Sequence, residues 1–212
     1  MQFNNQKKGM LMAFTAMMFI TPDSLFIRLA SINSWNLIFY RGFIPFALVF
    51  VGLIIIYKTK FFKEILNNGW HGVVYALIFA LTNITFVISI ENTNVANTLI
   101  MVALAPMLSA VISLIFLKEN PDQKTWLAIL ITTFAVFFIF YDALNAGDIL
   151  GNVFGLLTAL GLAIGAVIIR SVKKISLVPS AMLGKLLVAL IALYFADNLE
   201  LKKNDLLIVP VM

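Results

Sequence analysis

The most constraining feature of this sequence is a long apolar run, Val95–Leu117, between two polar, charged clusters, Glu91–Asn94 and Lys118–Asn120. A helix needs about 20 apolar residues to cross the hydrocarbon core of a bilayer, at a rise of about 1.5 Å per residue. The run is long enough to do so. Pro106 lies near its centre, where the proline ring removes a backbone hydrogen bond. We therefore interpret the segment as a membrane-spanning helix that is kinked near its middle.

Further runs of this kind follow one another along the chain, joined by short polar connections. Hydrophobic residues make up 62% of the sequence and charged residues 12%, whereas soluble domains average roughly 45–50% and about 25%. Too few charges remain to cover a water-facing surface. We predict an all-α membrane protein with seven transmembrane helices plus a partial eighth, which begins at Asp205–Met212. The seven predicted spans are Gly9–Ala30, Trp35–Tyr57, Trp70–Ile90, Val95–Leu117, Trp126–Tyr141, Ile149–Arg170 and Leu177–Ala196.

Lysine and arginine gather on one side of this predicted bundle. Cytoplasmic loops of membrane proteins carry an excess of these residues. The opposite side holds only Lys202 and Lys203, with Arg28 at its boundary. We therefore predict a multi-pass protein of the cell (inner) membrane whose N-terminus is cytoplasmic. The cations on the predicted cytoplasmic side are Lys7, Lys8, Lys58, Lys60, Lys63, Lys118, Lys124, Arg170, Lys173 and Lys174.

Two stretches, Gly9–Arg28 and Gly151–Arg170, run from glycine to arginine over the same interval. Each is followed by a polar link and another span with a cation in its first third, Arg41 or Lys185, although the offset differs by two residues. A repeat of five spans forces its second copy to enter the membrane upside down. Inverted repeats are common among secondary transporters, whose sites lie near the middle of the bilayer. Chance similarity between two apolar helices is the alternative.

Three ionisable residues, Asp23, Arg41 and Lys185, lie within the predicted spans. Such a residue costs about 2.5–3.5 kcal/mol at the centre of a membrane helix on insertion scales. Asp23 and Arg41 both lie roughly 10 Å below the outer surface, at about 1.5 Å per residue, so neighbouring antiparallel helices can pair them. The pair either ties the first helix to the second or lines a polar cavity that meets a zwitterionic or charged substrate. Snorkelling to the lipid headgroups is a third interpretation for Arg41.

Amide and hydroxyl side chains lie on two further spans. Asn83 is midway along the third span, and Asn97 and Thr98 are near the outer start of the fourth. Hydrogen bonds between helices are one interpretation. Together with Asp23 and Arg41, however, they supply polar groups from four helices at middle to outer depth, as a cavity would require. We predict these five residues as the substrate-binding residues.

Proline and glycine mark candidate hinge or packing positions at Pro22, Pro106, Gly151 and Gly155. Pro106 deprives the carbonyl of Val102 of its helical donor, and in lipid that carbonyl needs another partner or a wet cavity. The prolines are therefore either packing kinks or flexible points along a pathway. The four-residue spacing of the two glycines is typical of closely packed membrane helices.

The sequence offers little that enzyme chemistry could use. It contains no cysteine and one histidine, His71, and it lacks both the His-Glu-x-x-His motif and the Gly-Lys-Ser/Thr of a nucleotide-binding loop. Asp23 has no second intramembrane carboxylate beside it. We predict that the protein is not an enzyme and has no catalytic residue, metal or cofactor. Since no basic stretch is interleaved with aromatic residues, we also expect no nucleic-acid binding.

Four local motifs are distributed over the predicted spans. The fourth span carries the central Pro106 and is followed by Glu119 just past its end. The other three are Tyr40-Arg41-Gly42 in the second span, Asn94–Thr98 at the start of the fourth and Gly151-x-x-x-Gly155 in the sixth. With these motifs the chain resembles the EamA domain of the drug/metabolite transporter superfamily. The resemblance covers most of the chain and implies two EamA repeats.

The resemblance implies a first EamA repeat of five spans at residues 1–145. It also implies an incomplete second repeat at residues 146–212, with two spans plus the start of a third. The implied function is secondary transport, as an exporter by alternating access, of small organic metabolites such as amino acids or related compounds. The expected partners are the lipid bilayer and a small-molecule substrate. Because three spans of the usual ten are missing, the alternative is a truncated or split-carrier subunit, inactive by itself, that needs a homodimer or a partner chain.

Overall fold

The computed structural model describes residues 7–12, 14–15, 18, 23, 25, 27, 30, 32–58, 61–143, 149–172, 175–196 and 199. All regular structure in these residues is helical. The helices are α3 (Ser34–Tyr57), α4 (Phe61–Asn67), α5 (Gly69–Asn92), α6 (Val95–Val102), α7 (Ala105–Phe116), α8 (Gln123–Ala143), α9 (Ile149–Ser171) and α10 (Val178–Phe195).

The prediction of an all-helical membrane protein is confirmed. Five segments are long and apolar enough to cross a bilayer, namely α3, α5, α6 with α7, α9 and α10. They correspond to the second, third, fourth, sixth and seventh predicted spans. The fifth predicted span coincides with α8, which has 21 residues. The first and the partial eighth lie largely or wholly outside the described residues, so the total of seven spans plus a partial eighth stays a prediction.

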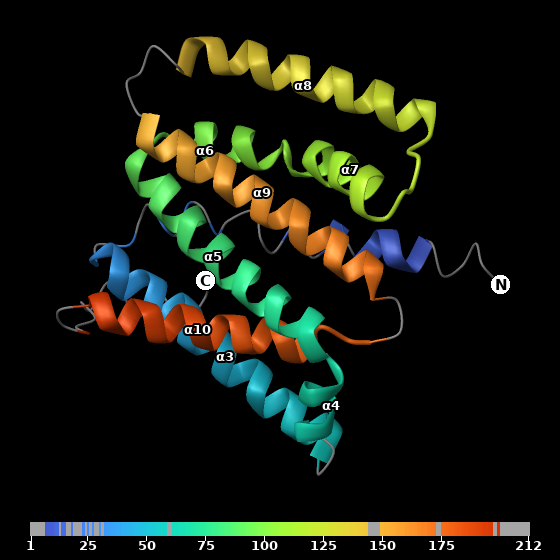
Figure 1. The fold of residues 1–212 in the computed structure, drawn as a ribbon. Coiled ribbons are helices and arrows are strands. Elements are labelled where there is room, and N and C mark those ends of the chain that lie inside the picture. Colours follow the sequence, from blue (N-terminus) through green and yellow to red (C-terminus); the bar gives the residue numbers. More distant parts are fainter. Residues whose placement is uncertain are drawn as a thin grey trace.

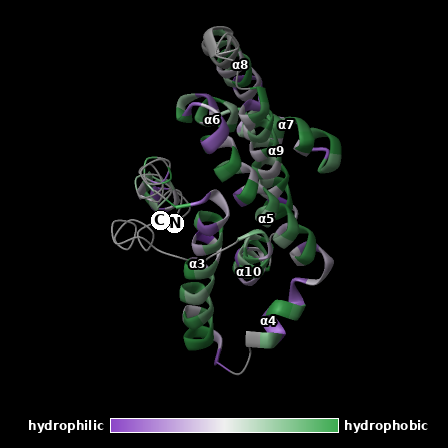
Figure 2. Ribbon diagram, turned by 90° about the vertical axis from the view of Figure 1, so that its left-hand side faces the viewer, coloured by the Kyte–Doolittle hydropathy of each residue, from purple (hydrophilic) through white to green (hydrophobic). Residues whose placement is uncertain are grey.

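The helices follow one another in space in an order that differs from the sequence. Figure 1 shows α3, α10, α5 and α9 as successive neighbours, then α6 and α7, then α8 at the far edge. Hydrophobic residues extend along most of each helix (Figure 2), and many large apolar side chains on the outer faces are exposed. Lipid tails would cover these faces, as expected for helices that cross a membrane.

Small residues bring the central helices into close backbone contact. A Cβ added at Gly42 of α3 would lie 2.7 Å from the Ala189 nitrogen of α10, and one at Gly184 of α10 would lie 2.8 Å from the Ala76 carbonyl of α5. One at Gly161 of α9 would lie 2.1 Å from Thr82 Oγ1 of α5. Van der Waals packing is a main source of helix association in lipid, and glycine permits the closest approach.

The predicted interruption of the fourth span at Pro106 is confirmed. α6 ends at Val102 and α7 begins at Ala105, so the span breaks into two helices with Pro106 in the first turn of the second. Proline fits the first turn of a helix because its missing N–H has no helical partner there. The break divides the span into a shorter first helix and a longer second helix, and both pack against α9.

We expect Gly42→Ala to destabilise the protein by about 1–3 kcal/mol, the usual cost of forcing extra volume into a packed contact. The added methyl group would meet backbone atoms of α10, which cannot rotate away. The measurement is the free energy of unfolding in mixed micelles titrated with SDS.

Gly52→Ala is the matched control, because Gly52 lies on the same helix with nothing within 4 Å of an added Cβ. It should be neutral or slightly stabilising, since alanine favours helix by about 1 kcal/mol over glycine. Equal destabilisation by both variants would contradict the proposed contact between α3 and α10.

Candidate functional site

Asp23 and Arg41 form a two-pronged ion pair. Arg41 Nη1 donates to Asp23 Oδ1 at 2.7 Å, and Arg41 Nη2 donates to Asp23 Oδ2 at 2.8 Å. The side chain of Arg41 is only 10% exposed, and that of Asp23 is 16% exposed. Such paired, charge-assisted hydrogen bonds are among the strongest that side chains make. The pairing predicted from depth along the two spans is confirmed.

The position of Arg41 follows from how α3 packs against α10. The Asn33 side chain caps the start of α3 by accepting from the Trp35 nitrogen at 3.4 Å. The Trp35 ring stacks on Phe195 at the end of α10, with 4.6 Å between ring centroids. This stacking joins the start of one helix to the end of the other, so the two run antiparallel. Arg41 lies about two turns into α3, next to the close contact at Gly42.

Lys185, from the middle of α10, joins this pair. Its Nζ donates to Asn83 Oδ1 of α5 at 2.6 Å and lies 5.6 Å from the centroid of the Phe79 ring. Asn83 Nδ2 in turn donates to the Phe79 carbonyl at 2.7 Å. The backbone of Lys185 lies against α3 beside Arg41, because a Cβ added at Gly42 would lie 2.8 Å from the Lys185 carbonyl oxygen. We call Asp23, Arg41, Asn83 and Lys185 the charged cluster.

The residues of the charged cluster come from four places in the chain. Asp23 precedes α3, and the other three residues lie in α3, α5 and α10. Two cations and one carboxylate give it a formal charge of +1 among the described residues. Lys185 is the member that the sequence-based choice of site residues left out. Its place as the second cation of the predicted repeat, opposite Arg41, was the signal that could have identified it.

Asn97 and Thr98 lie in a different cluster, where α5, α6 and α9 meet. The hydroxyls of Thr98 and Ser89 are 2.8 Å apart, and Ser89 also donates to the Gly151 carbonyl at 2.8 Å. Asn97 Nδ2 donates to Thr93 Oγ1 at 3.3 Å. The structure therefore does not bring these two residues together with Asp23 and Arg41. Their hydrogen bonds join helices, which is the first of the two interpretations that the sequence left open.

Gly151 and Gly155 line the same junction. A Cβ at Gly151 would lie 2.5 Å from Thr93 Cβ, and one at Gly155 would lie 3.0 Å from the Ser89 hydroxyl. Both glycines therefore lie at close approaches of α9 to α5. Pro22, the remaining predicted hinge or packing residue, lies outside the described residues.

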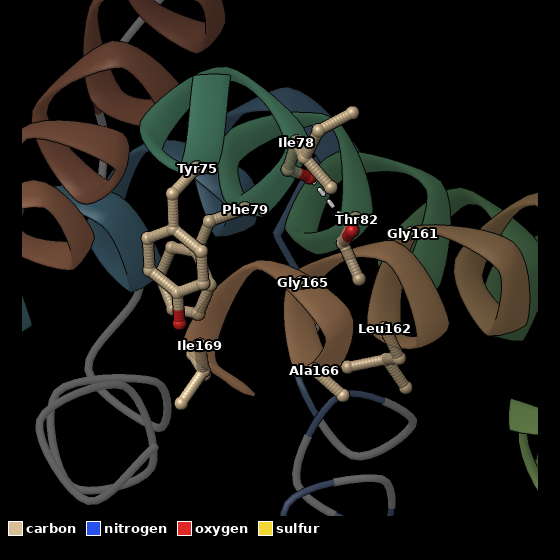
Figure 3. A pocket seen from close by; sticks show the side chains of 9 residues that line it. All are labelled: Tyr75, Ile78, Phe79, Thr82, Gly161, Leu162, Gly165, Ala166 and Ile169. Atoms are coloured by element: carbon tan, nitrogen blue, oxygen red, sulfur yellow. Dashed lines mark hydrogen bonds between the residues drawn. The ribbon is translucent and has the colours of Figure 1, made fainter. Parts of the chain in front are cut away.

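An apolar pocket of about 160 Å³ lies between α5 and α9. Figure 3 shows Tyr75, Phe79 and Thr82 of α5 on one side and α9 on the other, where Gly161 and Gly165 leave room. Phe79 belongs to this pocket and also lies beside Lys185. One aromatic ring thus connects the apolar pocket to the charged cluster. The complete lining is Tyr75, Ile78, Phe79, Thr82, Gly161, Leu162, Gly165, Ala166 and Ile169.

A second ion pair ties the ends of α7 and α9 together. Arg170, in the last turn of α9, pairs with Glu119 just after α7 and donates to the Ser113 hydroxyl at 3.4 Å. The side chains of Arg170 and Glu119 are 53% and 39% exposed. Ser113 itself is buried. This pair lies at one end of the bundle, away from the charged cluster near its middle.

Comparison with known proteins identifies one family. The sequence profile of the EamA-like transporter family matches residues 7–141, which is more than half of the chain. The comparisons with curated proteins and with solved structures found no match. The matched range includes Asp23, Arg41 and Asn83 of the charged cluster, whereas Lys185 lies beyond it.

We expect Asp23→Asn and Arg41→Met each to destabilise the protein by about 3 kcal/mol, the lower end of the cost of breaking a buried ion pair. Each variant leaves one charge without its partner in a low-dielectric region. The double variant should lose less than the sum of the two, because it leaves neither charge alone. SDS titration of all four forms measures this coupling.

The exposed Lys124→Met serves as the control for loss of a cation. Single variants that stay within about 0.5 kcal/mol of the parent, the range of ordinary surface substitutions, would show that the ion pair does not stabilise the fold.

Proposed function

Because the chain belongs to the EamA-like transporter family, we propose that it works as a secondary carrier of small organic metabolites by alternating access. It is a multi-pass membrane protein of a transporter family, so lipid surrounds it and small molecules are its cargo. The observation that supports transport of small metabolites through this bundle is the charged cluster. Ionisable side chains are costly inside a bilayer, and where they occur they commonly mark a substrate or ion pathway.

The position of the charged cluster supports a substrate site. Lys185 lies near the middle of α10, and Asn83 lies in the second half of α5. Secondary transporters bind their substrates near the bilayer midplane, between elements that rock against each other. The apolar pocket beside Phe79 adds a surface for the non-polar part of a metabolite. A polar group and an apolar group of one amino-acid-like molecule would therefore both find partners.

The two-repeat arrangement, with residues 1–145 in the first repeat and 146–212 in the second, remains part of the proposal. Arg41 and Lys185 hold similar places in the two predicted repeats, and both belong to the charged cluster. Their helices, α3 and α10, also pack directly against each other. Convergence of equivalent positions at one site is what an inverted repeat would produce.

We further propose that the carrier acts as an exporter in the cell (inner) membrane with its N-terminus in the cytoplasm. The distribution of lysine and arginine supports this orientation. In it, the Glu119–Arg170 pair lies at the cytoplasmic end of the bundle. Breaking that pair would be part of opening the cytoplasmic side, and a proton or the membrane potential would supply the driving force.

The role of the charged cluster predicts a loss of transport. Proteoliposomes carrying the chain are loaded with single radiolabelled amino acids, and efflux is followed for the parent, Asp23→Asn, Arg41→Ala and Lys124→Met. The first two substitutions should lower efflux roughly tenfold or more, since a hydrogen bond to a charged group contributes about 1.5–3 kcal/mol. Lys124→Met should transport like the parent.

Unchanged efflux in both cluster variants, with normal insertion, would contradict the proposed site. Efflux that appears only when a second chain supplies further spans would instead favour the split-carrier alternative, in which Asp23, Arg41, Asn83, Asn97 and Thr98 belong to a subunit without transport of its own.

Alternating access also predicts that the ends of α7 and α9 must separate during transport. The chain has no cysteine, so Glu119→Cys with Arg170→Cys introduces the only two thiols. A short, reducible bifunctional thiol reagent should join them and stop efflux, and reduction should restore it. The same reagent should leave each single-cysteine variant active. Full efflux by the cross-linked protein would show that this end does not open.

A further inference from the structure

Lys185 is the cation of the charged cluster that has no carboxylate partner among the described residues. Arg41 donates to both carboxylate oxygens of Asp23, whereas Lys185 donates to the neutral amide oxygen of Asn83. Neither of the ion pairs Asp23–Arg41 and Glu119–Arg170 includes Lys185. Among the described residues, the charged cluster therefore holds one positive charge more than its single carboxylate can balance.

We propose that Lys185 binds the carboxylate of the transported substrate, so that the cargo is an organic monocarboxylate. This inference rests on the proposed function and names the substrate group that the charged cluster recognises. A single uncompensated cation matches a single negative charge. A phosphate, with up to two charges and more acceptor atoms, is usually held by several cationic or N–H donors, which this cluster does not offer.

The predicted repeat explains why the protein leaves this position open. In the register that aligns Gly9–Arg28 with Gly151–Arg170, the position of Asp23 corresponds to Gly165. The first half thus supplies a carboxylate for Arg41, and the second half has a residue without a side chain at the matching place. Gly165 instead lines the apolar pocket. The carboxylate that would accompany Lys185 would then come from the substrate.

The surroundings of Lys185 also limit the rest of the substrate. The Phe79 ring lies 5.6 Å from Lys185 Nζ and forms part of the pocket of about 160 Å³. An apolar cavity of about 150 Å³ can hold a molecule as large as benzene. A compact branched or cyclic apolar group therefore fits beside the carboxylate. The probe that combines these features is 4-methylpentanoate, and its amide is a neutral molecule of nearly the same shape.

The test measures binding by the full chain in detergent, independently of transport. Thermal unfolding is followed at increasing concentrations of 4-methylpentanoate, of 4-methylpentanamide and of sodium chloride. The carboxylate should raise the melting temperature, and the amide and chloride should raise it little or not at all. Lys185→Gln should weaken the apparent affinity for the carboxylate about 10- to 100-fold, because it removes a hydrogen bond from a charged donor.

Two further variants separate recognition from folding. Glutamine can still donate to Asn83 Oδ1, so Lys185→Gln should melt close to the parent when no probe is present. Lys185→Arg keeps the charge and should retain the preference for the carboxylate over the amide. Lys124→Gln, at an exposed position, should bind like the parent.

Equal stabilisation by the carboxylate, its amide and chloride would overturn the inference, as would undiminished carboxylate binding by Lys185→Gln. These outcomes differ from failure of the proposed function. A chain that binds the carboxylate through Lys185 but moves no labelled 4-methylpentanoate across proteoliposomes would refute the carrier and leave the anion site standing. Transport of the carboxylate and of its amide at equal rates would support the carrier and refute carboxylate recognition by Lys185.

Discussion

The organisation of this protein depends on one constraint: a charged side chain inside the bilayer needs a charged or polar partner, since lipid cannot solvate it. Asp23 meets that requirement for Arg41 through two short hydrogen bonds. Breaking the pair would leave either charge buried alone, so the Asp23 side chain is held firmly to α3. Lys185 shares the same environment with a neutral amide as its partner. The contrast between these two cations gives the charged cluster its net positive charge.

The close packing of the helices and the geometry of the charged cluster have a common origin. Gly42 lets the backbone of α10 approach α3 at the level of Lys185, whose carbonyl would lie 2.8 Å from an added Cβ. Gly184, the neighbour of Lys185, lets the other side of α10 approach α5. These two glycine contacts therefore place the part of α10 that carries Lys185 close to both α3 and α5. A larger residue at Gly42 or Gly184 would move the lysine as well as loosen the bundle.

Much of this arrangement could be predicted from the sequence. The lengths of the apolar runs predicted the positions of the helices, and the missing N–H of proline predicted the break at Pro106. The equal depth of Asp23 and Arg41 in neighbouring spans predicted their ion pair. Depth alone was insufficient for Asn97 and Thr98, because residues at one level of a bundle can face different neighbours. Their helix packs against α9, while the charged cluster lies between α3, α5 and α10. Lys185 was left out of the predicted site for the same reason: hydropathy does not reveal which helices are neighbours.

The two ion pairs differ in a way that bears on how such a bundle could move. Asp23–Arg41 is largely buried, and separating it would be costly. Glu119–Arg170 is substantially exposed, and exposed ion pairs contribute little, about 0–1 kcal/mol. The end of α9 can therefore part from α7 at far lower cost than the charged cluster can come apart. A carrier needs this difference in the cost of separation, because the ends of the bundle must open in turn while the substrate site between them keeps its geometry.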